Sequence, residues 1–158
     1  MFNVSKAPEP GPVRRVLMVD SIECDLRAVR WLLLDAGIET TYVGTASSAR
    51  NIDEKFDALL TEAVLDDGSG IDLAGELIAD GKVSRVVFYT EGTLPDALRE
   101  ARRLGPVLFK KDGPLGLVHA LETAPKPKSA FPPPEEGHAR YFEQIASGIK
   151  HAASGLRH

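Results

Sequence analysis

The chain has 158 residues, of which 43% are hydrophobic and 27% are charged, and its formal net charge is -4. This composition is typical of one globular domain with a short appendage and argues against a largely disordered chain. The acidic balance argues against a nucleic-acid partner and against a basic membrane-binding patch. The single cysteine, Cys24, excludes an internal disulfide, and no apolar run approaches the roughly 20 residues of a membrane span. We therefore expect a cytoplasmic protein without a membrane segment.

Proline-rich stretches divide the chain into parts. Residues 1–12 are predicted to be a flexible N-terminal segment. Residues 125–137 predict a stiff, extended linker, because proline cannot continue a helix. Between them, residues 13–124 alternate short apolar runs with amphipathic segments, so this block is the predicted folded domain.

The middle block is predicted to contain five β–α pairs. The predicted strands lie at residues 13–19, 39–43, 58–61, 85–89 and 107–109. The predicted helices lie at residues 22–36, 45–52, 71–79, 93–104 and 115–121. Repeated alternation with short loops predicts a parallel sheet that is covered by helices on both faces.

Polar residues follow four of the five predicted strands. They are Asp20, Glu62, Thr90 and Lys110. In such sheets functional groups gather beyond the carboxyl ends of the strands. Two carboxylates, a hydroxyl and an ammonium are therefore expected to meet at one edge of the sheet, where they predict a polar site.

The stretch EAVLDDGSGIDL, which begins at Glu62, resembles the phosphoacceptor loop of the receiver domains of two-component response regulators. Over residues 14–124 the chain is similar to this family: Asp20 resembles the acidic end of its first strand, Thr90 its switch hydroxyl and Lys110 its last-strand lysine. The resemblance implies an α/β, flavodoxin-like, doubly wound (βα)5 domain with sheet order 2-1-3-4-5. In the family, an aspartate takes a phosphoryl group with the help of Mg²⁺, and the lysine and threonine bind the phosphate oxygens. The implied partners are a histidine kinase, a phosphotransfer protein or another regulator.

The chain departs from the family pattern at several positions. Glu62 stands at the acceptor position, so its carboxylate lies one methylene farther out, roughly 1.5 Å. Ser21 replaces the second acidic residue of the metal site, and Glu91 stands where a small residue is usual. Two prolines and an aromatic residue of the family are replaced by Asp66, Lys111 and Val107. We interpret the chain as a pseudo-receiver that is not phosphorylated, in which Glu62 reaches Lys110 and supplies a permanent negative charge.

Three alternatives stay open. In the first, Asp66 or Asp67 accepts a phosphoryl group, which makes the chain a functional Mg²⁺-dependent relay. In the second, Asp20, Glu62 and Glu23 hold a metal ion for structure only. In the third, the domain is a flavodoxin-like module that binds a small ligand. The pseudo-receiver interpretation itself predicts a binding protein with no catalysed reaction, no metal and no cofactor.

Two apolar features are candidate partner-binding surfaces. Trp31 and Leu34 lie off the predicted core face of the first helix, which includes Ile22 and Leu26, and are neighbours at i,i+3. Residues 138–158 predict a C-terminal amphipathic helix. The apolar seam of that helix includes Phe142, Ile145 and Ile149. So short a helix is marginal alone in water, so we expect it to pack on its own domain, on a second copy in a homodimer or on a partner protein.

Overall fold

The computed structural model describes residues 12–92 and 94–127. The chain divides into two units, residues 1–126 and 127–158, and the helices and strands below all lie in the first. The predicted C-terminal helix lies outside the described residues, with its seam of Phe142, Ile145 and Ile149. Most of the predicted N-terminal segment and linker lie outside them as well.

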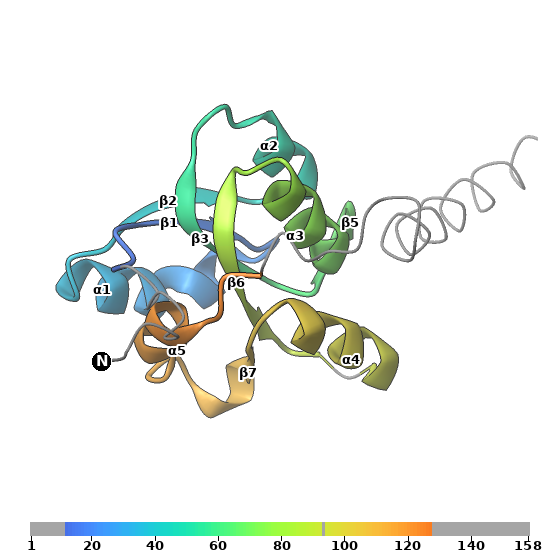
Figure 1. Cartoon of the computed structure of the whole chain (residues 1–158). Helices are drawn as coiled ribbons and strands as arrows, with labels where there is room; N and C mark the ends of the chain where they lie inside the picture. Colours follow the sequence, from blue (N-terminus) through green and yellow to red (C-terminus); the bar gives the residue numbers. More distant parts are fainter. Residues whose placement is uncertain (1–11, 93, 128–158) are drawn as a thin grey trace, which may run out of the picture. The chain divides into compact units, whose positions relative to one another are not determined.

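Five parallel strands form one sheet in the order β2-β1-β3-β6-β7 (Figure 1). The strands are β1 (Arg15–Val19), β2 (Glu39–Val43), β3 (Phe56–Thr61), β6 (Val83–Thr90) and β7 (Val107–Phe109). Counted along the chain, this order is 2-1-3-4-5, which confirms the predicted flavodoxin-like topology. Two strands start earlier than predicted because Phe56 of β3 pairs with Val83 of β6 at the amino end of the sheet.

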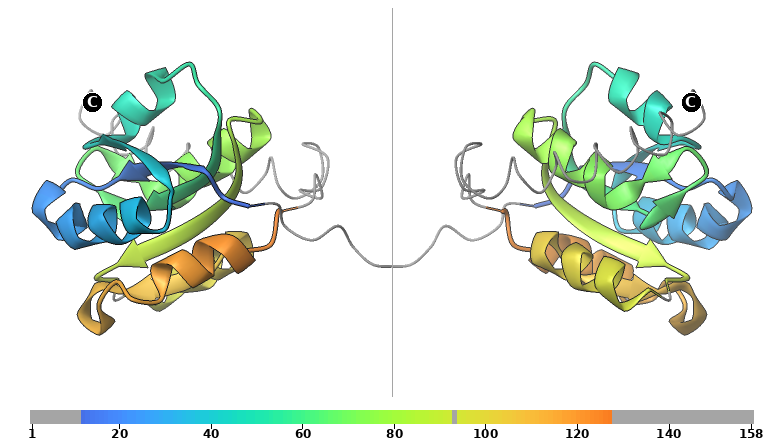
Figure 2. Two further views of the ribbon diagram at one scale, coloured as in Figure 1. Left: turned by 90° about the vertical axis from the view of Figure 1, so that its left-hand side faces the viewer. Right: turned by 90° about the vertical axis from the view of Figure 1, so that its right-hand side faces the viewer.

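Helices cover both faces of the sheet (Figures 1 and 2). The first helix α1 (Arg27–Asp35) packs beside α5 (Leu117–Thr123) on one face. On the other face α3 (Gly70–Ala79) packs between α2 (Ala46–Asn51) and α4 (Pro95–Leu104). The sheet is therefore shielded on both sides, as parallel sheets require.

The core between the sheet and helices α1 and α5 is built from alternate residues of the strands. Val16 and Met18 of β1 point to this face, because alternate residues of a strand share a side. They belong to one fully buried cluster with Val29 and Leu33 of α1 and Leu121 of α5. The intervening strand residues are buried too, which explains the near-continuous apolar runs that predicted these strands.

The segment after β1 differs from the helix predicted over residues 22–36. It opens with a 3₁₀ turn, η1 (Glu23–Leu26), before α1 begins. The carboxylate of Asp20 accepts a hydrogen bond from the backbone N–H of Ile22 at 2.9 Å, which turns the chain directly after the strand. Ile22 is 47% exposed, so its predicted place on the core face is wrong, and the buried stripe starts at Leu26.

A short hairpin follows β3, where the sequence predicted only a glycine-rich loop. Its strands are β4 (Val64–Leu65) and β5 (Gly68–Ser69), which pair antiparallel. The Asp67 carboxylate in its turn accepts hydrogen bonds from the backbone N–H groups of Ala46 at 2.9 Å and Ser47 at 3.0 Å. The hairpin is thereby fastened to the start of α2.

The last helix begins later than predicted. A second 3₁₀ turn, η2 (Lys110–Asp112), follows β7 directly. Gly113 then adopts a φ of 79°, a left-handed conformation that favours glycine. The chain then continues through residues 114–116, and α5 runs from Leu117 to Thr123, two residues later at each end than the helix predicted over 115–121.

Asp72 of α3 gives a test of this packing. Its side chain is 7% exposed, and burial raises the pKa of its carboxyl to about 6, with Glu76 raising it further and Arg50 opposing. The folded protein therefore holds this proton more tightly than the unfolded chain, so stability falls as pH rises from about 4 to 6. We predict that Asp72→Asn raises the free energy of unfolding at pH 7.5 by about 1–3 kcal/mol and by much less at pH 4.

Urea unfolding at the two pH values measures this difference. Asp80→Asn, an exposed change at the other end of α3, is the control and should shift the free energy by less than about 0.5 kcal/mol. A loss of stability in Asp72→Asn at pH 7.5 would contradict the account.

Candidate functional site

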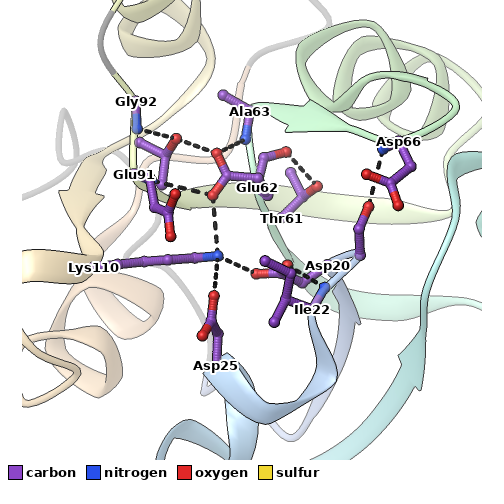
Figure 3. Close-up of polar contacts among 12 residues, drawn as sticks. Asp20, Ile22, Asp25, Thr61, Glu62, Ala63, Asp66, Glu91, Gly92 and Lys110 are labelled. Carbon is purple, nitrogen blue, oxygen red and sulfur yellow. Dashed lines mark hydrogen bonds and ion pairs between the residues drawn. The ribbon is translucent and has the colours of Figure 1, made fainter.

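Lys110 lies at the centre of a carboxylate cluster at the carboxyl edge of the sheet (Figure 3). Its Nζ lies 2.7 Å from Oδ2 of Asp20, 3.0 Å from Oδ2 of Asp25 and 3.2 Å from Oε2 of Glu62. Its side chain is 10% exposed. Burial opposes the charged ammonium, but the hydrogen bonds to Asp20 and Asp25 outweigh it, so the pKa of Lys110 is raised. One ammonium thus contacts three carboxylates. The predicted contact between Lys110 and Glu62 is present.

Asp20 is held in place by the first two strands. It directly follows β1, and its buried carboxylate uses Oδ1 for the Ile22 N–H and Oδ2 for Lys110. The Tyr42 hydroxyl of β2 donates to the backbone carbonyl oxygen of Asp20 at 2.6 Å. Both carboxylate oxygens are therefore already engaged by groups of the protein.

The carboxylate of Glu62 is surrounded by donors (Figure 3). Oε1 accepts hydrogen bonds from the Thr90 hydroxyl and, at 3.1 Å, from the backbone N–H of Ala63. Oε2 accepts from the backbone N–H of Glu91 at 3.2 Å and contacts Lys110. Donors at the carboxyl ends of β3, β6 and β7 therefore fix one negative charge in one position.

Two glycines make this close packing possible. A Cβ at Gly70, the first residue of α3, would lie 1.8 Å from the carbonyl oxygen of Glu62. A Cβ at Gly92 would lie 2.8 Å from the side chain of Thr90. The glycine-rich motif after β3 thus lets α3 begin directly against the backbone of Glu62.

Ser21 and Asp66 join the loops after β1 and β3. The Ser21 hydroxyl oxygen accepts a hydrogen bond from the backbone N–H of Asp66 at 2.9 Å. Asp66 and Glu91 line the same cavity as Glu62, whereas the Asp67 carboxylate is bound to the start of α2. Of the two alternative phosphoacceptors, Asp66 is therefore the one placed at the site.

Asp25 joins this cluster, and sequence reasoning did not single it out. A regular helix from residue 22 gave no reason to expect Asp25 at the site. The 3₁₀ turn η1 instead brings its carboxylate to Lys110. The signal that was available is an acidic residue five positions after Asp20, in the first turn of the segment that follows the strand.

The carboxylate arrangement does not match the structural-metal alternative. Glu23, its third predicted ligand, has Oε1 at 3.9 Å from Nη1 of Arg30. Across residues 12–92 and 94–127, no three His, Cys, Asp or Glu side chains are grouped so as to hold a metal ion. The donor set also fits Mg²⁺ poorly, because Lys110 lies between the carboxylates and Ser21 brings no charge.

The carboxyl edge of the sheet encloses a cavity of about 360 Å³. Asp20, Glu62 and Lys110 line it together with Leu94 and Leu98. The site thus combines charged and apolar lining residues.

Trp31 and Leu34 lie on the exposed side of α1, 73% and 64% exposed. Their predicted place off the core face is confirmed. They line a second cavity of about 400 Å³ together with Arg27 and Arg30. Their role in binding a partner stays a prediction.

No protein-family model and no curated protein matches this chain. Solved structures do match. The signal receiver domain of an HD domain-containing protein from Pseudomonas fluorescens Pf-5 is 19% identical, with a TM-score of 0.60, and the match covers 70% of this chain and 95% of that one. This chain has the receiver-domain fold.

Two further matches support the receiver fold. A CheY-like response regulator receiver domain from Methanospirillum hungatei JF-1 is 20% identical, with a TM-score of 0.58, and the match covers 68% of this chain and 89% of that one. A response regulator from Burkholderia pseudomallei, solved with a phosphorylated aspartic acid, a calcium ion and citrate, is 19% identical with a TM-score of 0.63. That match covers 70% of this chain and 67% of the other. Within the described part of this chain, none of the helices has the length and apolar character needed to cross a membrane.

The shared ammonium can be tested by removing it. Lys110→Met leaves three carboxylates without their common partner, so we predict a loss of about 3 kcal/mol in the free energy of unfolding at pH 7. Urea unfolding at pH 7 measures this loss.

Lys111→Met is the matched control, because Lys111 is exposed and its Nζ lies over the ring of Phe109. It should change the free energy of unfolding by less than about 0.5 kcal/mol at the same pH. Equal losses in the two variants would show that the cluster does not stabilise the fold.

Proposed function

We propose that this receiver-fold protein is a pseudo-receiver of a bacterial two-component signalling pathway. It works in the cytoplasm by binding other proteins, without catalysing a reaction and without phosphorylation at the end of β3. Its partners are a histidine kinase, a phosphotransfer protein or another regulator. The fold supports a role in such signalling. The chemistry of the site supports the absence of phosphorylation.

The observation that carries the proposal is the set of donors around Glu62. In the receiver family, the strand-end lysine and threonine bind the oxygens of the phosphoryl group. Here Lys110 and the Thr90 hydroxyl hold the side-chain carboxylate of Glu62 itself, together with two backbone N–H groups. The contacts that would receive a phosphoryl group are therefore satisfied by a group that belongs to the chain.

The surroundings of Glu62 also disfavour an entering phosphoryl group. Glu91 and Asp66 line the cavity, and both add negative charge near the point of entry. Asp20 has both oxygens engaged, so it offers Mg²⁺ no free oxygen without giving up a contact. These features favour a fixed state of the site over a cycle of phosphorylation and hydrolysis.

A relay that uses Asp66 is the second candidate function. It is favoured by one observation, the position of Asp66 at the same cavity as Asp20 and Lys110. In that case the acceptor lies in the loop rather than at the strand end. The experiment below separates the two candidates, because the modified residue can be located.

Intact-protein mass spectrometry after incubation with acetyl phosphate and Mg²⁺ tests the proposal. We predict no phosphoryl adduct on the native chain, because Glu62 itself occupies the donors that would bind a phosphoryl group. An adduct on Glu62→Asp alone would show that the rest of the site can serve an aspartate at this position. Glu62→Gln is the matched control, since it keeps the length of glutamate and lacks the charge.

Fragmentation of any labelled protein then identifies its modified residue. An adduct at Glu62 or at Asp66 of the native chain would overturn the pseudo-receiver proposal. An adduct at Asp66 in particular would establish the relay in its place.

A further inference from the structure

Three exposed aliphatic side chains surround the mouth of the cavity at the carboxyl edge. Ile22 follows β1, Val64 begins the hairpin after β3, and Leu94 precedes α4. All three line the cavity, and Val64 and Leu94 are 61% and 62% exposed. Because they come from three separate segments, the fold itself gathers them at one place. Exposed aliphatic residues around one hollow are typical of a binding surface.

The rest of the lining of this cavity is partly apolar and partly charged. Ala97 and Leu98 of α4 add apolar side chains. Asp20, Glu62, Asp66 and Glu91 contribute carboxylates to its lining, against the single ammonium of Lys110. Lys110 is already shared with Asp25 as well. The lining therefore carries an excess of negative charge beside exposed aliphatic side chains, and Asp66 and Glu91 are themselves exposed.

We propose that this cavity is the docking site for a basic, aliphatic peptide segment of a partner protein. One Lys or Arg side chain of the partner enters the cavity, and an aliphatic neighbour of it packs on the rim of Ile22, Val64 and Leu94. The inference rests on the proposed function, since it names the chemistry of the partner that a binding protein of this kind takes.

Both parts of the lining fit such a segment. Lysine and arginine have a hydrocarbon stem and a cationic head, so one side chain can contact Leu98 and reach the carboxylates of Asp66 and Glu91. An anionic ligand would meet like charge instead. A second copy of this chain fits less well, because a two-fold contact through this face would place two acidic cavities against each other.

The proposal is tested by nuclear magnetic resonance on the full-length, ¹⁵N-labelled chain. The probe is a capped peptide with the core Ser-Leu-Arg-Leu-Ser. We expect saturable shifts of the backbone amides of Val64, Glu91 and Leu94, all of which line the cavity. In one control peptide glutamate replaces the arginine, and in the other serine replaces both leucines. Each should bind at least about tenfold more weakly.

Substitutions in the protein locate the site. The double variant Val64→Ser and Leu94→Ser should weaken peptide binding by about tenfold, because it removes exposed aliphatic surface without touching the core. Leu34→Ser on α1 is the matched control, since Leu34 is 64% exposed, close to the exposure of Leu94. Glu91→Gln should weaken binding several-fold and reduce its dependence on salt.

Several results would overturn the proposal. They are no saturable shift up to about 2 mM peptide, equal binding of the glutamate peptide, and shifts centred on Trp31 and Leu34. A concentration-dependent dimer that Val64→Ser and Leu94→Ser abolish would assign the face to a second copy instead. Failure here leaves the proposed function standing if the native chain takes no phosphoryl group. A phosphoryl adduct on the native chain refutes the proposed function whatever the peptides do.

Discussion

The ammonium of Lys110 is the group on which the carboxyl edge of the sheet depends. Asp20, Asp25 and Glu62 come from three places in the chain, and their charges would repel one another without a common cation. Because the ammonium follows β7, it ties the last strand of the sheet to the ends of β1 and β3. Removing either the ammonium or one of the carboxylates is costly, because the groups that remain are still charged and buried.

Glutamate fits at the end of β3 because of the length of its side chain. An aspartate there ends one methylene earlier, which leaves room for a group to be added between it and the donors. The longer side chain of Glu62 spans that distance and reaches Thr90 and Lys110 directly. The glycine at position 70 keeps α3 close behind it. The strand-end lysine and threonine, which bind phosphoryl oxygens in receiver domains, thus hold the longer carboxylate of Glu62 in this chain.

Much of this arrangement could be predicted from the sequence. The strands and the meeting of Asp20, Glu62, Thr90 and Lys110 follow from apolar runs that end in polar residues, because parallel strands share one edge. The order of the strands was instead implied by the resemblance to receiver domains. Asp25 could not be found in this way. Its place depends on a 3₁₀ turn that one hydrogen bond from Ile22 to Asp20 helps to set, and helical periodicity does not encode such a turn. The hairpin after β3 was missed for a similar reason, since the contacts of Asp67 with α2 join residues distant in sequence.

The four donors around Glu62 have a consequence for how such a protein is controlled. A phosphoryl group is added and hydrolysed, so its lifetime sets the duration of a signal. The carboxylate of a glutamate side chain is part of the protein, so it has no such lifetime, and no phosphatase can remove it. If Glu62 stands in for that group, the amount of the protein in the cell becomes the variable that sets the output. Synthesis and degradation of the chain then do the work that kinase and phosphatase do elsewhere.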